Sequence, residues 1–223
     1  SKTVNHKSKI SMAIFHSHIF DNASGSVGNV TMCKYKGKSI AKGKIFFKKK
    51  KQSPAQVIQQ TRFKALSDLS YHFYAAIQAG FPRQSWSTAR TRFIGMNQNA
   101  VEIDAETLDV TIRLERVTCT TGNLTQPAVE VHIRENERIV RAEWFRQPLS
   151  PLAKDEDDIY LVIHDTKEQD TLAYPLGKRG IPGTKEIPLH KDFTPANCVA
   201  YAFALSPVNT RASVSKYTNI ILE

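Results

Sequence analysis

The spacing of apolar residues predicts one long helix in the N-terminal half of the chain. A capping box marks its start, because Ser53 is followed by Pro54 at the first helical position and by Gln56 three residues after the cap. Apolar residues then recur at intervals of three and four: Phe63, Leu66, Leu69, Phe73 and Ile77. We therefore expect a helix of about 25 residues that ends at Gly80 and turns this stripe toward a core.

A second, shorter helical pattern follows, with Ser85 as its cap. Its inward positions are expected to be Trp86, Ala89 and Phe93, and its outward positions Arg90 and Arg92. The two arginines would enlarge any basic surface on this part of the chain.

Residues 27–47 predict two strands joined by Lys36-Gly37, a two-residue turn in which glycine can adopt a positive φ. A loop of this length fixes the register, so that Tyr35 pairs with Lys38 and Thr31 with Lys42. Alternation then places Lys38, Lys42 and Lys44 on one face, and the apolar residues Val30, Met32, Ala41 and Ile45 on the other. The hairpin is therefore expected to have a cationic face and an apolar face.

Beyond residue 100 the hydrophobic pattern changes to a period of two. The alternating runs cover residues 108–117, 127–134, 138–145, 158–165, 170–176, 185–190, 197–206 and 214–222. Such short runs, separated by Gly, Pro and Asn, are typical of an immunoglobulin-like or fibronectin-like β-sandwich. The sequence thus predicts an α+β protein with a basic hairpin and helical region at 1–100 and a β-sandwich domain at 101–223.

The two predicted regions carry opposite charge. Residues 1–100 hold 17 Lys and Arg against two acidic residues, whereas residues 101–223 hold 14 against 19, which gives +15 and −5 within the overall +10. A long stretch with so few carboxylates has a field that its own side chains cannot neutralise. An anionic partner is therefore expected, with nucleic acid as the first choice. The alternatives are an acidic neighbouring subunit and the acidic half of the chain itself.

The strongest candidate for that contact is the lysine-rich segment from the hairpin to the first helix. Lysine is a hydrated point charge, so this composition favours contact with phosphates over reading of bases. Lysines also protect exposed strand edges from aggregation, which is the structural alternative. The candidate nucleic-acid-binding residues are Lys34, Tyr35, Lys36, Lys38, Lys42, Lys44, Lys48, Lys49, Lys50 and Lys51.

The sequence contains no recognisable catalytic, metal or membrane signature. The cysteines Cys33, Cys119 and Cys198 lack paired spacing, and the histidines are dispersed. The glycine-rich segment 177–185 has the order Gly-Thr-Lys, with a proline inside it, where a phosphate-binding loop needs Gly-Lys-Ser/Thr before a helix. We therefore predict no enzyme, no cofactor and no membrane span, and a cytoplasmic location or a place in a virion assembled there.

Several segments together resemble a family of Bacteroidota proteins whose domain has no known function. The resemblance lies in Gly25-Ser26-Val27-Gly28-Asn29-Val30, Lys36-Gly37, the helix after Ser53-Pro54, and the late residues Trp144, Arg179-Gly180, Tyr201 and Phe203. It covers most of residues 12–223, and the usual start of that family corresponds to Met12, which would make residues 1–11 an extension. The resemblance implies the same architecture and brings no activity or substrate. Members usually carry an arginine in the second hairpin strand, where this chain has lysines.

Two functional hypotheses follow. The first is a non-enzymatic, sequence-tolerant nucleic-acid-binding protein. The second is a structural component of a larger assembly, such as a phage virion or a surface apparatus, in which the basic hairpin docks on an acidic neighbour or on another copy of the chain.

Overall fold

A computed structural model describes residues 12–15, 23–44, 52–81, 84–208 and 210–223, and the chain divides into two compact units, Ser1–Gln52 and Ser53–Glu223. The division therefore lies at residue 52, whereas the sequence placed it near residue 100. The reason is that the helices share a hydrophobic core with the β region.

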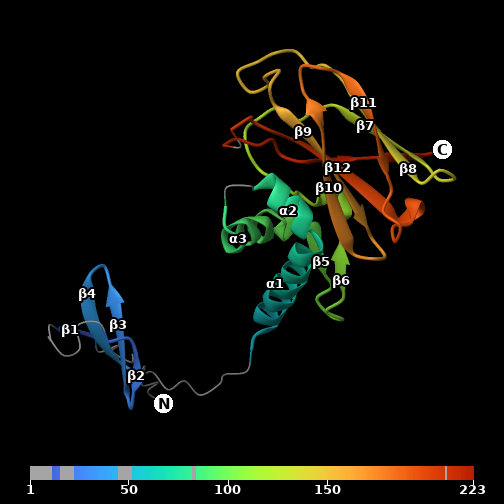
Figure 1. Ribbon diagram of the computed structural model, residues 1–223. Helices are drawn as coiled ribbons and strands as arrows, with labels where there is room; N and C mark the ends of the chain where they lie inside the picture. The colour runs from blue at the N-terminus through green and yellow to red at the C-terminus, as the bar shows by residue number, and fades with distance from the viewer. Residues whose placement is uncertain (1–11, 16–22, 45–51, 82–83, 209) are drawn as a thin grey trace. The chain divides into compact units, whose positions relative to one another are not determined.

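The smaller unit contains one antiparallel sheet. Its strands are β1 (Met12–Phe15), β2 (Gly25–Val27), β3 (Val30–Tyr35) and β4 (Lys38–Gly43), in the order β1-β4-β3-β2 (Figure 1). The predicted hairpin is β3 and β4, and its register is confirmed, with Tyr35 opposite Lys38 and Thr31 opposite Lys42. The turn residues Lys36 and Gly37 both have positive φ, +48° and +77°, as a two-residue hairpin turn of this kind requires.

The larger unit begins with three helices, α1 (Pro54–His72), α2 (Tyr74–Gly80) and α3 (Trp86–Met96). The capping box is present, since Ser53 Oγ accepts from the Gln56 N–H at 3.3 Å and Gln56 Oε1 accepts from the Ser53 N–H at 3.0 Å. The single helix predicted to Gly80 is instead two helices that meet at Phe73. Most of the predicted stripe is buried, but the prediction was wrong for Phe63, which is 54% exposed.

The β region of this unit contains two four-stranded sheets and a small hairpin within the described residues. One sheet has the order β10-β9-β12-β13 and the other β11-β8-β7-β14, while β5 pairs only with β6. The β7–β14 pair is parallel, and the other pairs are antiparallel. The strands are β5 (Val101–Ile103), β6 (Val110–Ile112), β7 (Val129–Arg134), β8 (Ile139–Trp144), β9 (Asp158–Asp165), β10 (Asp170–Lys178), β11 (Gly183–Pro188), β12 (Cys198–Leu205), β13 (Lys216–Thr218) and β14 (Ile220–Leu222).

Two hydrophobic clusters explain why helices and sheets form one unit. The first joins β7, β8 and β11 of one sheet to one side of β9, through residues such as Leu161 and Ile163. The second joins the opposite side of β9 and β12, through Val162 and Phe203, to the three helices. The sheet β10-β9-β12-β13 is therefore covered on both faces, and the chain is a mixed α+β protein whose helices are part of the larger unit.

Candidate functional site

The described part of the smaller unit carries five lysines and no carboxylate: Lys34, Lys36, Lys38, Lys42 and Lys44. All five are exposed. Tyr35 is 60% exposed beside the turn, and the ammonium group of Lys36 lies 5.5 Å from the centre of its ring. The end of the β3–β4 hairpin thus presents an aromatic ring among cations.

The lysines are distributed over both faces of this sheet. Alternation along β3 and β4 places Lys38 and Lys42 on the face of Tyr35, and Lys34 on the opposite face. Lys36 lies in the turn, and Lys44 follows β4, where its backbone N–H donates to Asn29 O at 2.7 Å. The cationic surface therefore surrounds the hairpin end and extends along one face of β4.

The predicted separation into an apolar and a cationic face was wrong. Ile40 lies on the lysine face, as the predicted register requires, but it is buried at 9% exposure while Lys38 and Lys42 beside it are exposed. On the other face, Val30 is 38% exposed. The sequence analysis did not predict β1, which pairs with β4 and places Ile14 opposite Ile40.

The remaining candidate lysines, Lys48, Lys49, Lys50 and Lys51, lie outside the described residues, as does the predicted apolar residue Ile45.

A second candidate site is a cavity of about 640 Å³ within the larger unit. Helix α1 contributes Lys64, Asp68 and His72, and strand β6 contributes the apolar side chains of Val110 and Ile112. The end of β9 and the turn after it complete the lining with His164, Thr166 and Gln169. Val110 and Ile112 alternate with polar residues in the predicted run 108–117 and were therefore expected to face inward, but they are 41% and 36% exposed and line this cavity.

His164 is a buried histidine in the lining of this cavity. Its side chain is buried, its Nδ1 lies 2.9 Å from Thr171 Oγ1, and its ring stacks on Phe73 with centroids 4.5 Å apart. Burial, followed by the nearby His72, lowers the pKa of His164 to about 4. The imidazole is therefore neutral at physiological pH. No sequence motif connects His72 with His164, because the packing of α1 against the sheet brings them together.

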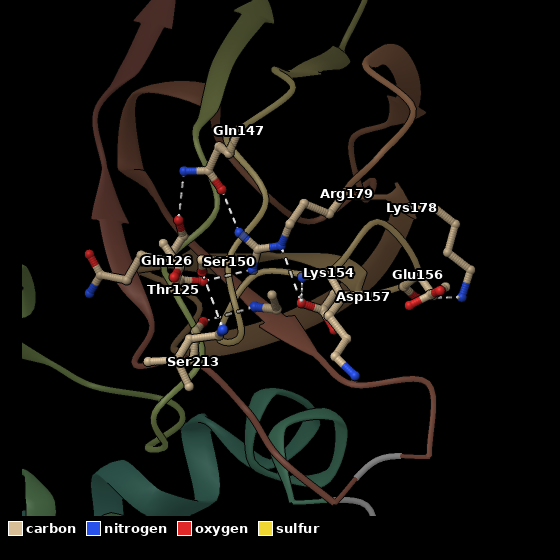
Figure 2. A network of polar contacts seen from close by, with 12 residues as sticks. Thr125, Gln126, Gln147, Ser150, Lys154, Glu156, Asp157, Lys178, Arg179 and Ser213 are labelled. Atoms are coloured by element: carbon tan, nitrogen blue, oxygen red, sulfur yellow. Dashed lines mark hydrogen bonds and ion pairs between the residues drawn. The ribbon is translucent and has the colours of Figure 1, made fainter.

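A third polar cluster surrounds Arg179, which is only 1% exposed (Figure 2). Its Nε lies 3.4 Å from Asp157 Oδ2, its Nη2 donates to Thr125 O at 2.7 Å, and its Nη1 donates to Gln147 Oε1. Burial lowers the pKa of Arg179, and the charge of Asp157 opposes that shift. Because the guanidinium is enclosed and paired, we interpret this cluster as structural.

The glycine-rich segment from Gly177 is also structural. It joins β10 to β11, as expected of a strand connection, and it encloses Trp144, whose Nε1 donates to Ile181 O at 2.7 Å. A Cβ on Gly177 or Gly183 would lie 2.6 or 2.8 Å from Trp144 Cζ2. These glycines therefore permit close packing on an indole ring, which is a sufficient reason for their positions.

No group of three or more His, Cys, Asp or Glu side chains could hold a metal ion within the described residues. None of the helices in that part of the chain combines the length and the apolar character needed to span a membrane.

No family model, curated protein or solved structure matches the chain.

Proposed function

We propose that the protein binds nucleic acid through the lysines of its small sheet, without reading sequence. The observation that carries the proposal is the presence of five exposed lysines and no carboxylate in the described part of that unit. Phosphate groups would pair with exposed ammonium groups of this kind, and the exposed ring of Tyr35 offers a surface for base stacking.

The proposal is tested by measuring affinity against salt concentration. If the five lysines contact duplex phosphates, the logarithm of the association constant should fall with the logarithm of salt concentration at a slope of about −4 to −5. Fluorescence anisotropy of a labelled duplex measures this slope. No binding at low salt contradicts the proposal.

A matched pair of variants assigns the slope to the sheet. Replacing Lys36, Lys38 and Lys42 together by Gln should make the slope shallower by about 2 to 3. The control replaces three exposed lysines of the larger unit by Gln, namely Lys167, Lys191 and Lys216. Equal slopes for the two variants would contradict the assignment of the phosphate contacts to the sheet.

The second candidate function is a structural component of a larger assembly, and it has its own supporting observation. The end strands of the sheet, β1 and β2, carry exposed apolar side chains, since Ile14 is 57% and Val27 75% exposed. An open, apolar strand edge favours pairing with another chain. Size-exclusion chromatography with light scattering tests this, because a nucleic-acid-free ring or polymer is expected from assembly and a monomer contradicts it.

For the larger unit, we propose an immunoglobulin-like or fibronectin-like arrangement of the two sheets. The shared core between β7, β8 and β9 supports it, as does the short spacing of the strands.

A further inference from the structure

Four side chains of the helical region form a surface of the kind that stacks nucleic-acid bases. We call Tyr71, Tyr74, Trp86 and Arg90 the aromatic–arginine surface. The rings of Tyr71 and Tyr74 lie 6.0 and 4.8 Å from that of Trp86, centre to centre. Tyr71 is 58% and Tyr74 54% exposed, while Trp86 and Arg90 are half-buried. The rings of Tyr71 and Tyr74 are thus exposed to solvent, although they lie beside the hydrophobic cluster on which Trp86 packs.

Arg90 is held in a fixed position on this surface. Its Nε donates to Ser70 Oγ at 2.9 Å, and its Nη2 donates to Ser67 Oγ. The guanidinium carbon lies 4.7 Å from the centre of the Tyr71 ring. Within the described residues, Nη1 donates no hydrogen bond and no carboxylate pairs with Arg90. Among the described residues the guanidinium therefore has donors left for an outside acceptor, and its side-chain conformation is already fixed.

The charge around the surface favours an anionic partner. Among the described residues of 53–100, the basic side chains are Arg62, Lys64, Arg90 and Arg92, and the only acidic one is Asp68. A protein partner would meet the same exposed rings, but a phosphate chain also satisfies the excess of positive charge. Base stacking on Tyr and Trp with a neighbouring arginine is the usual means of binding single strands.

We infer that the aromatic–arginine surface binds single-stranded nucleic acid, with bases stacked on Tyr71 and Tyr74 and a phosphate held by Arg90. The inference deepens the proposed function by adding a contact in the larger unit and a preference for unpaired bases. The inference depends on other side chains than the sheet lysines, so an experiment can contradict either proposal without contradicting the other.

The first experiment uses the unaltered full chain and its tryptophan fluorescence. A 12-residue oligo(dT) is titrated against an abasic oligonucleotide with the same number of phosphates. Quenching by oligo(dT) and little quenching by the abasic strand are expected, because a base stacked on Tyr71 or Tyr74 would lie beside the indole of Trp86. Trp86→Phe should remove the quenching, since the other tryptophan, Trp144, is buried. Equal responses to the two oligonucleotides would overturn the inference.

The second experiment measures affinity for oligo(dT) with substituted rings. Tyr71→Ser and Tyr74→Ser should each weaken binding by about five- to a hundredfold. The matched control is Phe145→Ser, which removes a 43% exposed ring outside this surface and should leave affinity unchanged. Arg90→Lys keeps the charge but loses the planar group, and it should also weaken binding.

The outcomes separate the two proposals. Quenching that survives the Gln substitutions of Lys36, Lys38 and Lys42 supports the aromatic–arginine surface, even where those substitutions flatten the salt dependence. Unchanged affinity in the Tyr71 and Tyr74 variants overturns the inference and leaves the sheet lysines as the proposed contact. A change of molecular mass by light scattering in these variants, without loss of oligo(dT) affinity, would identify a protein interface and overturn it as well.

Discussion

The neutral, buried His164 should make the stability of the larger unit fall as the pH is lowered below about 6.5. The pKa of this group is lowered to about 4, first by burial and then by His72. In the unfolded chain it returns to about 6.5. Between these two values the unfolded state binds more protons, so acidification favours unfolding. The stabilisation is complete above pH 6.5 and is lost as the pH falls to about 4.

The size of the effect follows from the difference between the two pKa values. At roughly 1.4 kcal/mol for each pKa unit, the loss is about 3 kcal/mol over the whole interval. The neighbouring Asp165 affects stability in a more acidic pH range than His164 does. Burial opposes its ionisation, but backbone N–H donors from Glu168, Thr194 and Lys167 outweigh burial and keep the pKa of Asp165 below 3.8. The difference between the unaltered chain and His164→Asn from pH 7 to pH 4.5 therefore measures the contribution of His164.

Urea unfolding followed by tryptophan fluorescence measures this loss, because both tryptophans, Trp86 and Trp144, belong to the larger unit. The free energy of unfolding of the unaltered chain should decrease steadily from pH 7 to pH 4.5. His164→Asn should be less stable at pH 7 but should lose less on acidification. His72→Gln should reduce the loss in part, since it removes one cause of the lowered pKa. Parallel pH curves for the unaltered chain and His164→Asn would refute the reasoning.

Two further predictions concern the packing of the larger unit. Gly177→Ala should destabilise it by about 1 to 3 kcal/mol, because the new methyl group meets Trp144 at 2.6 Å. Its control is Gly95→Ala in α3, where a Cβ meets nothing within 4 Å. Urea unfolding of this variant should show an increase of about 0.5 to 1 kcal/mol in the free energy of unfolding, because alanine favours the helix more than glycine does. Asp157→Asn should cost about 3 to 5 kcal/mol in the same assay, because the charge of Arg179 stays buried without its partner. Equal stabilities of the two glycine variants, or a loss below 1 kcal/mol for Asp157→Asn, would contradict these assignments.

Each predicted run between residues 127 and 206 contains one strand, whereas the run 214–222 contains two, β13 and β14, which belong to different sheets. The hairpin register also followed from sequence, since the two-residue turn at Lys36-Gly37 allows one pairing of its flanking strands. A period of two predicts strands that are buried on one side, which is confirmed for β8, where Val140 and Ala142 are buried, and wrong for β9. In β9, Val162 and His164 are buried as well because helices cover that face. A run of nearly continuous apolar residues is the available signal for such a strand.

The candidate sites were less predictable because they depend on contacts between distant segments. The break at Phe73 has no glycine or proline to mark it, yet it places Tyr71 in α1 and Tyr74 in α2 beside the same indole ring. The outward position predicted for Arg92 is confirmed, whereas Arg90 is half-buried against α1. Its anchoring by Ser67 and Ser70 could not be predicted, because it requires the packing of α3 on α1.

The two candidate surfaces differ in chemistry, and salt should separate their contributions. Contact between ammonium groups and phosphates weakens steeply as salt rises, because it depends on the release of counterions. Stacking on Tyr71 and Tyr74 displaces few ions and should persist. At low salt, duplex and single strands should therefore bind with similar affinity through the sheet lysines. At high salt, the single strand should retain an advantage that disappears in the Tyr71 and Tyr74 variants. If the affinities for duplex and single strand decrease equally across the salt range, charge alone governs binding and the stacking contact is contradicted.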